Sequence, residues 1–164
     1  MADNCCCEII RESSEDCSDD SCVFCVIAKG EDPETEILAQ DEEIICFKDI
    51  YPVAPFHFLV IPRKHIHSCL SLSTDHISLV QRMAKMGREV LKANNCVDFQ
   101  DISLGFHVPP YITVPHLHLH VLAPFSQLFK WAIFKYKNVW YITEEKMIQQ
   151  LKDKKRTCNK CGAV

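Results

Sequence analysis

The sequence has no apolar run that approaches the roughly 20 residues needed to span a bilayer. Its first twenty residues are acidic and lack the hydrophobic stretch of a secretory signal peptide. Positive charge is not in excess, because 18 Lys and Arg residues stand against 22 Asp and Glu residues, for a formal net charge of −4. That balance argues against a protein that binds nucleic acid mainly by charge. We therefore expect a soluble intracellular protein with no membrane and no nucleic-acid partner.

The chain does have enough apolar sequence for one packed domain. Its 164 residues are 48% hydrophobic and 24% charged, which is typical of a globular domain and excludes wholesale disorder. It also has 11 cysteines. Without a secretory signal, disulfides are not expected, and an odd count would leave one thiol over. Metal binding or simple burial is the better expectation for most of these thiols.

The pattern of apolar residues predicts an α+β fold. Residues 1–20 are strongly acidic without an apolar period and are expected to be a disordered, cysteine-containing tail. A long helix is expected over residues 74–94, and a last helix from Thr143. The expected strands are residues 42–48, 57–62, 101–107 and 116–122. The basic residues 153–164 are expected to be a flexible tail, which leaves residues 21–152 as the domain.

The most informative segment alternates histidine with aliphatic residues. His116, His118 and His120 fall on one face of a strand, while the residues between them face the other way and can anchor it in a core. Three imidazoles on one face are costly to bury without partners, so this face must meet a metal, an anion or a chain of hydrogen bonds. In one chemistry, a His-x-His pair directs two imidazoles at one zinc ion. In the other, the middle imidazole is a nucleophile for phosphoryl transfer, and its neighbours orient it and bind the phosphate.

This histidine segment resembles the signature of the histidine triad (HIT) superfamily, in which three histidines alternate with hydrophobic residues. The resemblance is carried by segments 22–27, 47–50, 57–66, 104–110 and 116–124, which occur in the family's order. It covers roughly residues 21–152, and the last two segments are most similar to the third type of histidine triad nucleotide-binding proteins. The resemblance implies a HIT fold, with a mostly antiparallel five-stranded sheet, one long helix and a C-terminal helix.

The resemblance also implies catalytic roles for four histidines. His118 would attack an α-phosphate and become transiently adenylylated. His120 would bind a phosphate oxygen and assist the leaving group. His116 would set the tautomer and orientation of His118 through a chain of hydrogen bonds, and His57, on the neighbouring strand, would support the triad. The chemistry implied requires no metal cofactor.

Substrate binding is implied for three further residues. Asp49 would hold the ribose hydroxyls, and Ile50 would pack on the base or sugar. Thr113 stands where related proteins place a small hydroxyl residue near the phosphate or leaving group. The loop before the triad, residues 107–115, departs from the family because it lacks the glycine-rich sequence of its best-known members. The resemblance therefore does not extend to phosphate contacts from the backbone of this loop.

Cys22 and Cys25 have the spacing of half a zinc site. Some relatives complete such a site with histidines at the positions of His65 and His116, so the resemblance implies a structural zinc that would tether the N-terminal segment to the sheet. The alternative is a pair of reduced, partly buried thiols. A second Cys-x2-Cys pair, within residues 158–161, has no third ligand beside it and is expected to lie in a solvated tail.

The function implied is that of a nucleotide phosphoramidase. It would hydrolyse adenosine 5′-phosphoramidates and aminoacyl-adenylates, such as lysyl-AMP, to AMP through an adenylyl intermediate on His118. One alternative is a dinucleoside polyphosphate hydrolase, but relatives of that kind carry an amide side chain where Thr113 stands. A second alternative is a non-catalytic nucleotide-binding or scaffold module.

The resemblance further implies a homodimer or higher homo-oligomer, with the helix of residues 74–94 near the interface. Trp131 and Trp140, late in the chain, are candidates for shaping the site of the purine nucleotide substrate. The cytoplasm is the expected compartment, with passive entry into the nucleus at this size.

Overall fold

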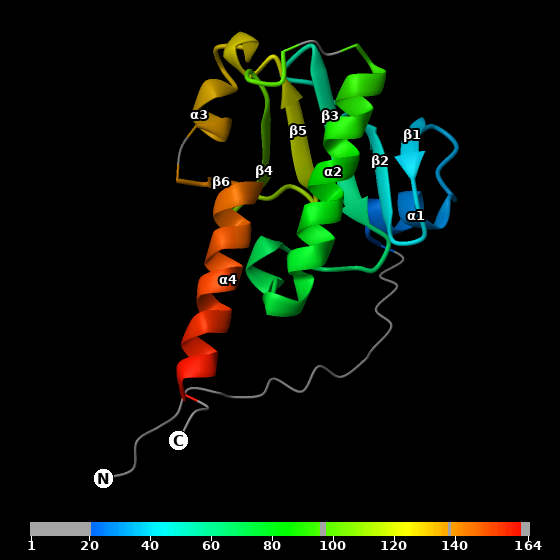
Figure 1. Ribbon diagram of the computed structural model, residues 1–164. Coiled ribbons are helices and arrows are strands. Elements are labelled where there is room, and N and C mark those ends of the chain that lie inside the picture. The colour runs from blue at the N-terminus through cyan, green and yellow to red at the C-terminus, as the bar shows by residue number, and fades with distance from the viewer. Residues whose placement is uncertain (1–20, 96–97, 138, 162–164) are drawn as a thin grey trace.

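The chain forms an antiparallel sheet with helices on both of its faces (Figure 1). The computed structural model describes residues 21–95, 98–137 and 139–161. The acidic tail expected over residues 1–20 lies outside the described residues. The α+β class predicted from the apolar pattern is confirmed.

Six strands form the sheet, in the order β1-β2-β3-β5-β4-β6, and every neighbouring pair is antiparallel. Their bounds are Ile37–Gln40 for β1, Ile44–Lys48 for β2, Phe56–Pro62 for β3, Ser103–His107 for β4, Leu119–Ala123 for β5 and Tyr141–Thr143 for β6. The expectation of five strands is therefore wrong. The apolar pattern does not predict β1 or β6 because they have only four and three residues, too few to show an alternation.

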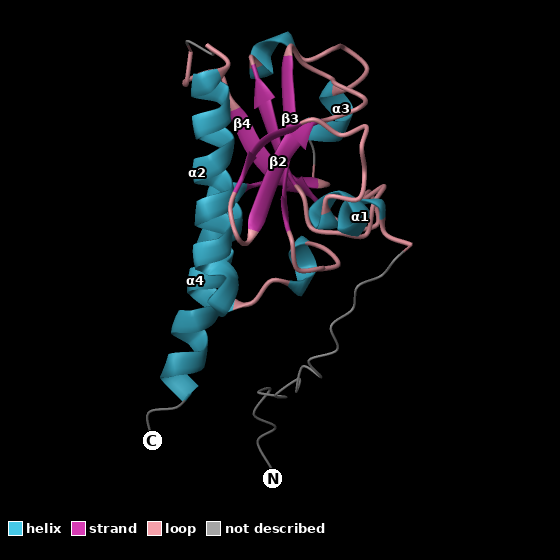
Figure 2. Cartoon of the chain, turned by 90° about the vertical axis from the view of Figure 1, so that its right-hand side faces the viewer, coloured by secondary structure: helices cyan, strands magenta, loops and turns pink. Residues whose placement is uncertain are grey.

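The helices divide between the two faces of the sheet. They are α1 (Val23–Lys29), α2 (Ile77–Ala93), α3 (Ile133–Tyr136) and α4 (Glu144–Cys161), with 3-10 turns at Cys69–Ser71, Thr74–His76 and Phe125–Gln127. Figure 2 shows α2 and α4 on one side of the strands and α1 and α3 on the other. The long helix expected over residues 74–94 is thus confirmed as one 3-10 turn followed by α2. The last helix begins directly after Thr143, as expected, and continues to Cys161, past the expected boundary at residue 152.

The alternation in the histidine segment separates a core face from a site face. Leu117, Leu119 and Val121 are fully buried in the main core, which α2 covers. Gly87 of α2 lies so close to the sheet that a Cβ there would be 2.6 Å from Cγ2 of Val121. Because side chains alternate along an extended chain, the intervening histidines point to the face opposite α2.

The edge of β4 is covered by the chain itself. Strand β6 pairs along β4, with His107 opposite Tyr141 and Gly105 opposite Thr143. The approach requires glycine at position 105, since a Cβ there would lie 2.5 Å from the carbonyl oxygen of Ile142. This pairing also sets the position of α4, which follows β6 and packs along α2.

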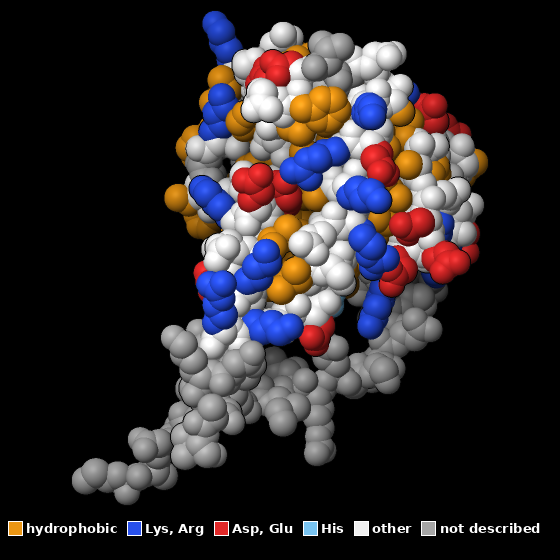
Figure 3. All heavy atoms as spheres, viewed as in Figure 1, with side chains coloured by type: hydrophobic (Ala, Val, Ile, Leu, Met, Phe, Trp, Pro, Cys, Tyr) orange, Lys and Arg blue, Asp and Glu red, His pale blue; other side chains and the backbone are white. Residues whose placement is uncertain are grey.

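The surface over α2 and α4 carries both signs of charge. Figure 3 shows Lys and Arg side chains interspersed with Asp and Glu on this face. None of the helices in the described ranges combines the length and the apolar character that a bilayer crossing requires.

Candidate functional site

Four histidines meet on the sheet face opposite α2. We call His57, His107, His118 and His120 the histidine cluster; they lie on or beside β3, β4 and β5 and all are buried. The ring of His120 is central, with centroid distances of 5.2 Å to His57, 4.6 Å to His107 and 5.0 Å to His118. Strand pairing brings β3 and β4 to either side of β5, so residues distant in the sequence share one site.

One hydrogen bond determines the tautomer of His118. Its Nδ1 lies 2.6 Å from the main-chain carbonyl oxygen of His116, and because a carbonyl only accepts, Nδ1 carries the proton and donates it. The neutral ring then has its lone pair on Nε2. The ring of Phe24, from α1, packs edge-on against this imidazole with a centroid distance of 5.3 Å. These two contacts fix the orientation of the His118 ring and leave Nε2 with a lone pair that could act as a nucleophile.

A second chain of hydrogen bonds determines the tautomers of His57 and His120. The backbone N–H of Val53 donates to Nδ1 of His57 at 3.3 Å, so the proton of His57 lies on Nε2. That nitrogen is 2.9 Å from Nδ1 of His120 and 3.2 Å from Oδ2 of Asp49. Because Nδ1 of His120 accepts, its proton lies on Nε2, which has no hydrogen-bond partner among the described residues. His120 therefore presents a free N–H beside His118, suited to an oxyanion.

Burial keeps the histidine cluster neutral. Desolvation lowers the pKa of His57 and of His107 to about 3 and holds the pKa of His118 and His120 below the usual value of 6.5. The same effect raises the pKa of Asp49, which is half-buried at the end of β2. Neutral imidazoles can act as nucleophile and hydrogen-bond donor at neutral pH, but they supply no positive charge.

The residues expected to bind substrate lie mostly at the surface. Asp49 contacts the histidine cluster as described and also accepts from the backbone N–H of Tyr51 at 2.8 Å. Ile50 is 80% exposed, and Thr113 and Trp131 are exposed as well. The ring of Trp140 packs on Tyr111, with centroids 4.5 Å apart.

Sequence reasoning assigned no role to His107 or Tyr136. His107 is buried, and neither of its ring nitrogens has a hydrogen-bond partner of normal geometry among the described residues. Tyr136, from α3, packs against the histidine cluster with centroid distances of 4.7 Å to His107 and 5.3 Å to His120. The alternation along β4 could have placed His107 on the site face, but no periodic signal in the sequence predicts the position of α3.

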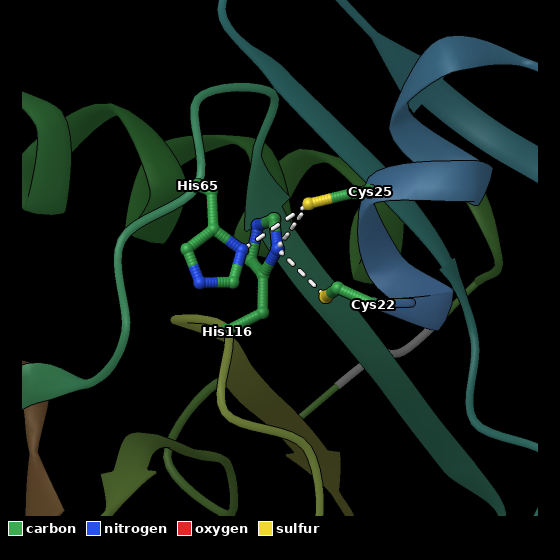
Figure 4. A group of neighbouring side chains, drawn as sticks. All are labelled: Cys22, Cys25, His65 and His116. Carbon is green, nitrogen blue, oxygen red and sulfur yellow. Dashed lines mark hydrogen bonds between the residues drawn. The ribbon is translucent and has the colours of Figure 1, made fainter. Parts of the chain in front are cut away.

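A second cluster contains the cysteine pair. Figure 4 shows Cys22 and Cys25, at the start of α1, pointing toward His65 and His116. We call these four residues the Cys–His cluster; their ligand atoms all lie within 4.8 Å of one another. Nδ1 of His116 is 3.5 Å from each sulfur, and Nδ1 of His65 is 3.2 Å from that of Cys25. All four residues expected to form a zinc site are therefore brought together.

The geometry of this cluster fits a tetrahedral metal. Zn–N and Zn–S bonds of about 2.0–2.3 Å place neighbouring ligand atoms about 3.3–3.8 Å apart, close to the separations given above. Nε2 of His116 lies 2.9 Å from the carbonyl oxygen of Pro62, so its proton is there and its lone pair, on Nδ1, faces the sulfurs. Burial lowers the pKa of His116 to about 4, which keeps that lone pair available.

His116 therefore serves the two clusters with different atoms. Its imidazole belongs to the Cys–His cluster, and its carbonyl holds His118. The resemblance to the HIT superfamily implies that His116 sets the tautomer and orientation of His118; in the structure the main-chain carbonyl of His116 makes this contact.

The chain is similar to several known proteins in sequence and in structure. Residues 21–133 match the family model described as "Scavenger mRNA decapping enzyme C-term binding". The chain is 64% identical to "Adenosine 5'-monophosphoramidase HINT3" of Danio rerio over 92% of this chain and 95% of the relative. The Mus musculus protein of the same name is 44% identical, over 82% of this chain and 83% of the relative. A solved "HIT family hydrolase from Clostridium thermocellum" is 32% identical with a TM-score of 0.58, covering 63% of this chain and 90% of that one.

Burial of the neutral histidines predicts that acid destabilises the fold. Between the ordinary pKa of 6.5 and the folded value of about 3, the unfolded chain binds a proton at His107 that the folded chain does not. The free energy of unfolding therefore falls as the pH drops below 6.5, by up to about 1.4 kcal/mol per pH unit for each such histidine. Urea denaturation at several pH values measures this free energy. We expect it to fall less steeply with decreasing pH in His107→Phe than in the wild type.

The exposed His67 provides the control for that experiment. His67→Phe should keep the acid dependence of the wild type. An equally steep fall in His107→Phe would contradict the assignment of a buried neutral imidazole at this position.

Proposed function

The chain belongs to the histidine triad (HIT) superfamily, and from that premise we propose that it is a nucleotide phosphoramidase. It hydrolyses adenosine 5′-phosphoramidates and aminoacyl-adenylates, such as lysyl-AMP, to AMP. The names of its Danio rerio and Mus musculus relatives support a P–N hydrolase acting on an adenosine 5′-phosphoryl group.

The observation that carries this proposal is that the Nε2 atoms of two neighbouring rings, His118 and His120, have complementary protonation states. Nε2 of His118 has a lone pair, because its Nδ1 donates to the carbonyl of His116. Nε2 of His120 has the proton, because its Nδ1 accepts from His57. A phosphate that contacts both rings would therefore meet a nucleophile on His118 and a hydrogen-bond donor on His120.

The reaction proceeds through two displacements at phosphorus. Nε2 of His118 forms a P–N bond while the bond from phosphorus to the leaving group breaks, which is a P–N bond in a phosphoramidate and a P–O bond in an aminoacyl-adenylate. The donor on His120 stabilises the charge on a phosphate oxygen. Hydrolysis of the adenylyl-histidine then releases AMP and restores His118. In net terms one water molecule is consumed: one of its protons goes to the departing amine or carboxylate, and its hydroxyl group goes to phosphorus. No metal cofactor is required for either displacement.

We propose for three residues the substrate-binding roles that the resemblance to the HIT superfamily implies. Asp49 binds the ribose hydroxyls, Ile50 packs on the base or sugar, and Thr113 lies near the leaving group. The exposure of Ile50 and Thr113 leaves both free to contact a ligand.

We also propose a structural zinc in the Cys–His cluster. The donor set of two thiols and two imidazoles, the spacing of the ligand atoms and the hydrogen bond from His116 to Pro62 all support it. When bound, the metal ties α1 to the loop after β3 and to the start of the histidine segment. The reacting phosphate lies at the histidine cluster and does not contact it.

We further propose that the chain forms a homodimer or a higher homo-oligomer, with α2 near the interface. This proposal rests on the membership of the chain in the HIT superfamily. We expect the protein in the cytoplasm, with passive entry into the nucleus, which its length of 164 residues supports.

Replacing the nucleophile should abolish turnover. We expect His118→Ala to lower kcat for a fluorogenic adenosine 5′-phosphoramidate by roughly 10³-fold or more, since the covalent route is lost. Mass spectrometry of the quenched wild type should detect an adenylyl group on His118, and His67→Ala should behave as the wild type. Robust turnover by His118→Ala would refute the assignment.

The wild type also tests the two alternative functions. Preferential turnover of diadenosine polyphosphates would favour the polyphosphate hydrolase, and tight nucleotide binding without turnover would favour a binding module.

Removing a thiol ligand should release zinc. We expect metal analysis to find about one zinc per chain in the wild type and much less in Cys22→Ser, with a lower melting temperature. Cys46→Ala, which changes a buried thiol of β2 outside the Cys–His cluster, should keep its zinc. Equal zinc contents in the wild type and Cys22→Ser would contradict the site.

The oligomeric state is measured by light scattering at the protein concentration of the activity assay. We expect a mass of at least twice the 18.9 kDa of one chain. A mass of one chain would contradict the proposed homodimer.

A further inference from the structure

The histidine cluster supplies no positive charge to an anionic substrate. Burial disfavours the charged form of His57, His107 and His120, and the nearby ionisable side chain of Asp49 is acidic. The substrate of the proposed reaction carries an anionic phosphoryl group whose charge grows in the transition state. The loop 107–115 lacks the glycine-rich sequence that would bring several backbone N–H groups to a phosphate. A cation from another element would therefore complement this site.

The helix α3 is fixed against the histidine cluster. Ala132 and Tyr136 are almost completely buried in a small hydrophobic group with Val53. The backbone N–H of Phe129 donates to the carbonyl of Val53 at 3.1 Å, and the N–H of Val53 is the group that holds His57. The position of α3 is therefore coupled directly to the residues that orient the site.

Lys135 lies on this helix, next to the ring that packs on the histidine cluster. Its side chain is half-buried, and its Nζ lies 5.7 Å from the ring centroid of Tyr136, which itself packs on His57 and His120. After burial, the positive charge of Lys135 is among the causes that lower the pKa of the four histidines, and it opposes the rise in the pKa of Asp49. The ion pairs found in the described part of the chain do not engage its ammonium group.

We propose that Lys135 binds the α-phosphate of the nucleotide substrate and supplies the cation that the histidine cluster lacks. This proposal rests on the proposed function, because it assigns a ligand group to the same site. The ammonium of Lys135 contacts non-bridging phosphate oxygens, while Nε2–H of His120 donates to another. Lys135 takes the role that the backbone N–H groups of a glycine-rich loop would have in binding the phosphate.

The test compares an anionic ligand with a neutral one that shares its nucleoside. Calorimetry on the full chain measures binding of AMP and of adenosine to the wild type, Lys135→Met and Lys135→Arg. We expect Lys135→Met to weaken AMP binding by roughly 10- to 100-fold, the effect of losing one charge-assisted hydrogen bond, and to leave adenosine binding within about twofold. Lys135→Arg should recover most of the AMP affinity because it keeps the charge.

Lys137 provides a matched control in the same segment. It is exposed and lies over the ring of Phe125, with Nζ 4.9 Å from the centroid. Lys137→Met should bind AMP as the wild type does. In the turnover assay, Lys135→Met should lower kcat/KM for the phosphoramidate by about 10²-fold, and Lys137→Met should leave it within about twofold.

The outcomes separate this proposal from the proposed function. Equal AMP affinities for Lys135→Met and Lys137→Met would overturn the role of Lys135, whether or not His118 forms the adenylyl intermediate. A wild type that binds adenosine as tightly as AMP would overturn it too, since no cation then recognises the phosphate. A selective loss of AMP binding in Lys135→Met, in a wild type without turnover, would support the phosphate site and reject the phosphoramidase.

Discussion

The hydrogen bond from Nδ1 of His118 to the carbonyl oxygen of His116 is the contact on which the chemistry of this protein depends. At 2.6 Å it assigns the proton of a neutral imidazole to one nitrogen and leaves the other with a lone pair. Burial protects this state, because it lowers the pKa of His118 and so keeps the ring from taking up a second proton. A cluster of buried, uncharged histidines is costly for folding, but it makes a nitrogen nucleophile available at neutral pH.

Contacts on both sides of the His116 carbonyl group fix its position. The backbone N–H of Leu117 donates to the carbonyl of Ile66 at 2.6 Å, which ties the histidine segment to the loop after β3. The imidazole of His116 lies in the Cys–His cluster, whose cysteines come from the same helix as Phe24. Since Phe24 packs on His118, α1 contacts both clusters. A metal bound in the Cys–His cluster would therefore also restrict the ring of His118.

Some features of this site can be predicted from local sequence patterns, and others depend on contacts that such patterns do not encode. The alternation around His118 predicts which side chains face the core, and the helix expected over residues 74–94 forms, because both signals are local. The strands β1 and β6 are too short to show a period. The contribution of the His116 carbonyl is a main-chain contact that side-chain patterns do not encode. Lys135 lies in a four-residue helix placed by packing on Val53, a contact between segments far apart in the chain.

The most direct test of this account is the tautomer of His118 itself. Nitrogen-15 NMR of the uniformly labelled protein at neutral pH, with His118→Ala to assign the signal, distinguishes a protonated Nδ1 from a protonated Nε2. We expect a neutral ring with the proton on Nδ1 and an unprotonated Nε2. A proton on Nε2, or a doubly protonated ring, would contradict the role of the His116 carbonyl and the assignment of His118 as the nucleophile.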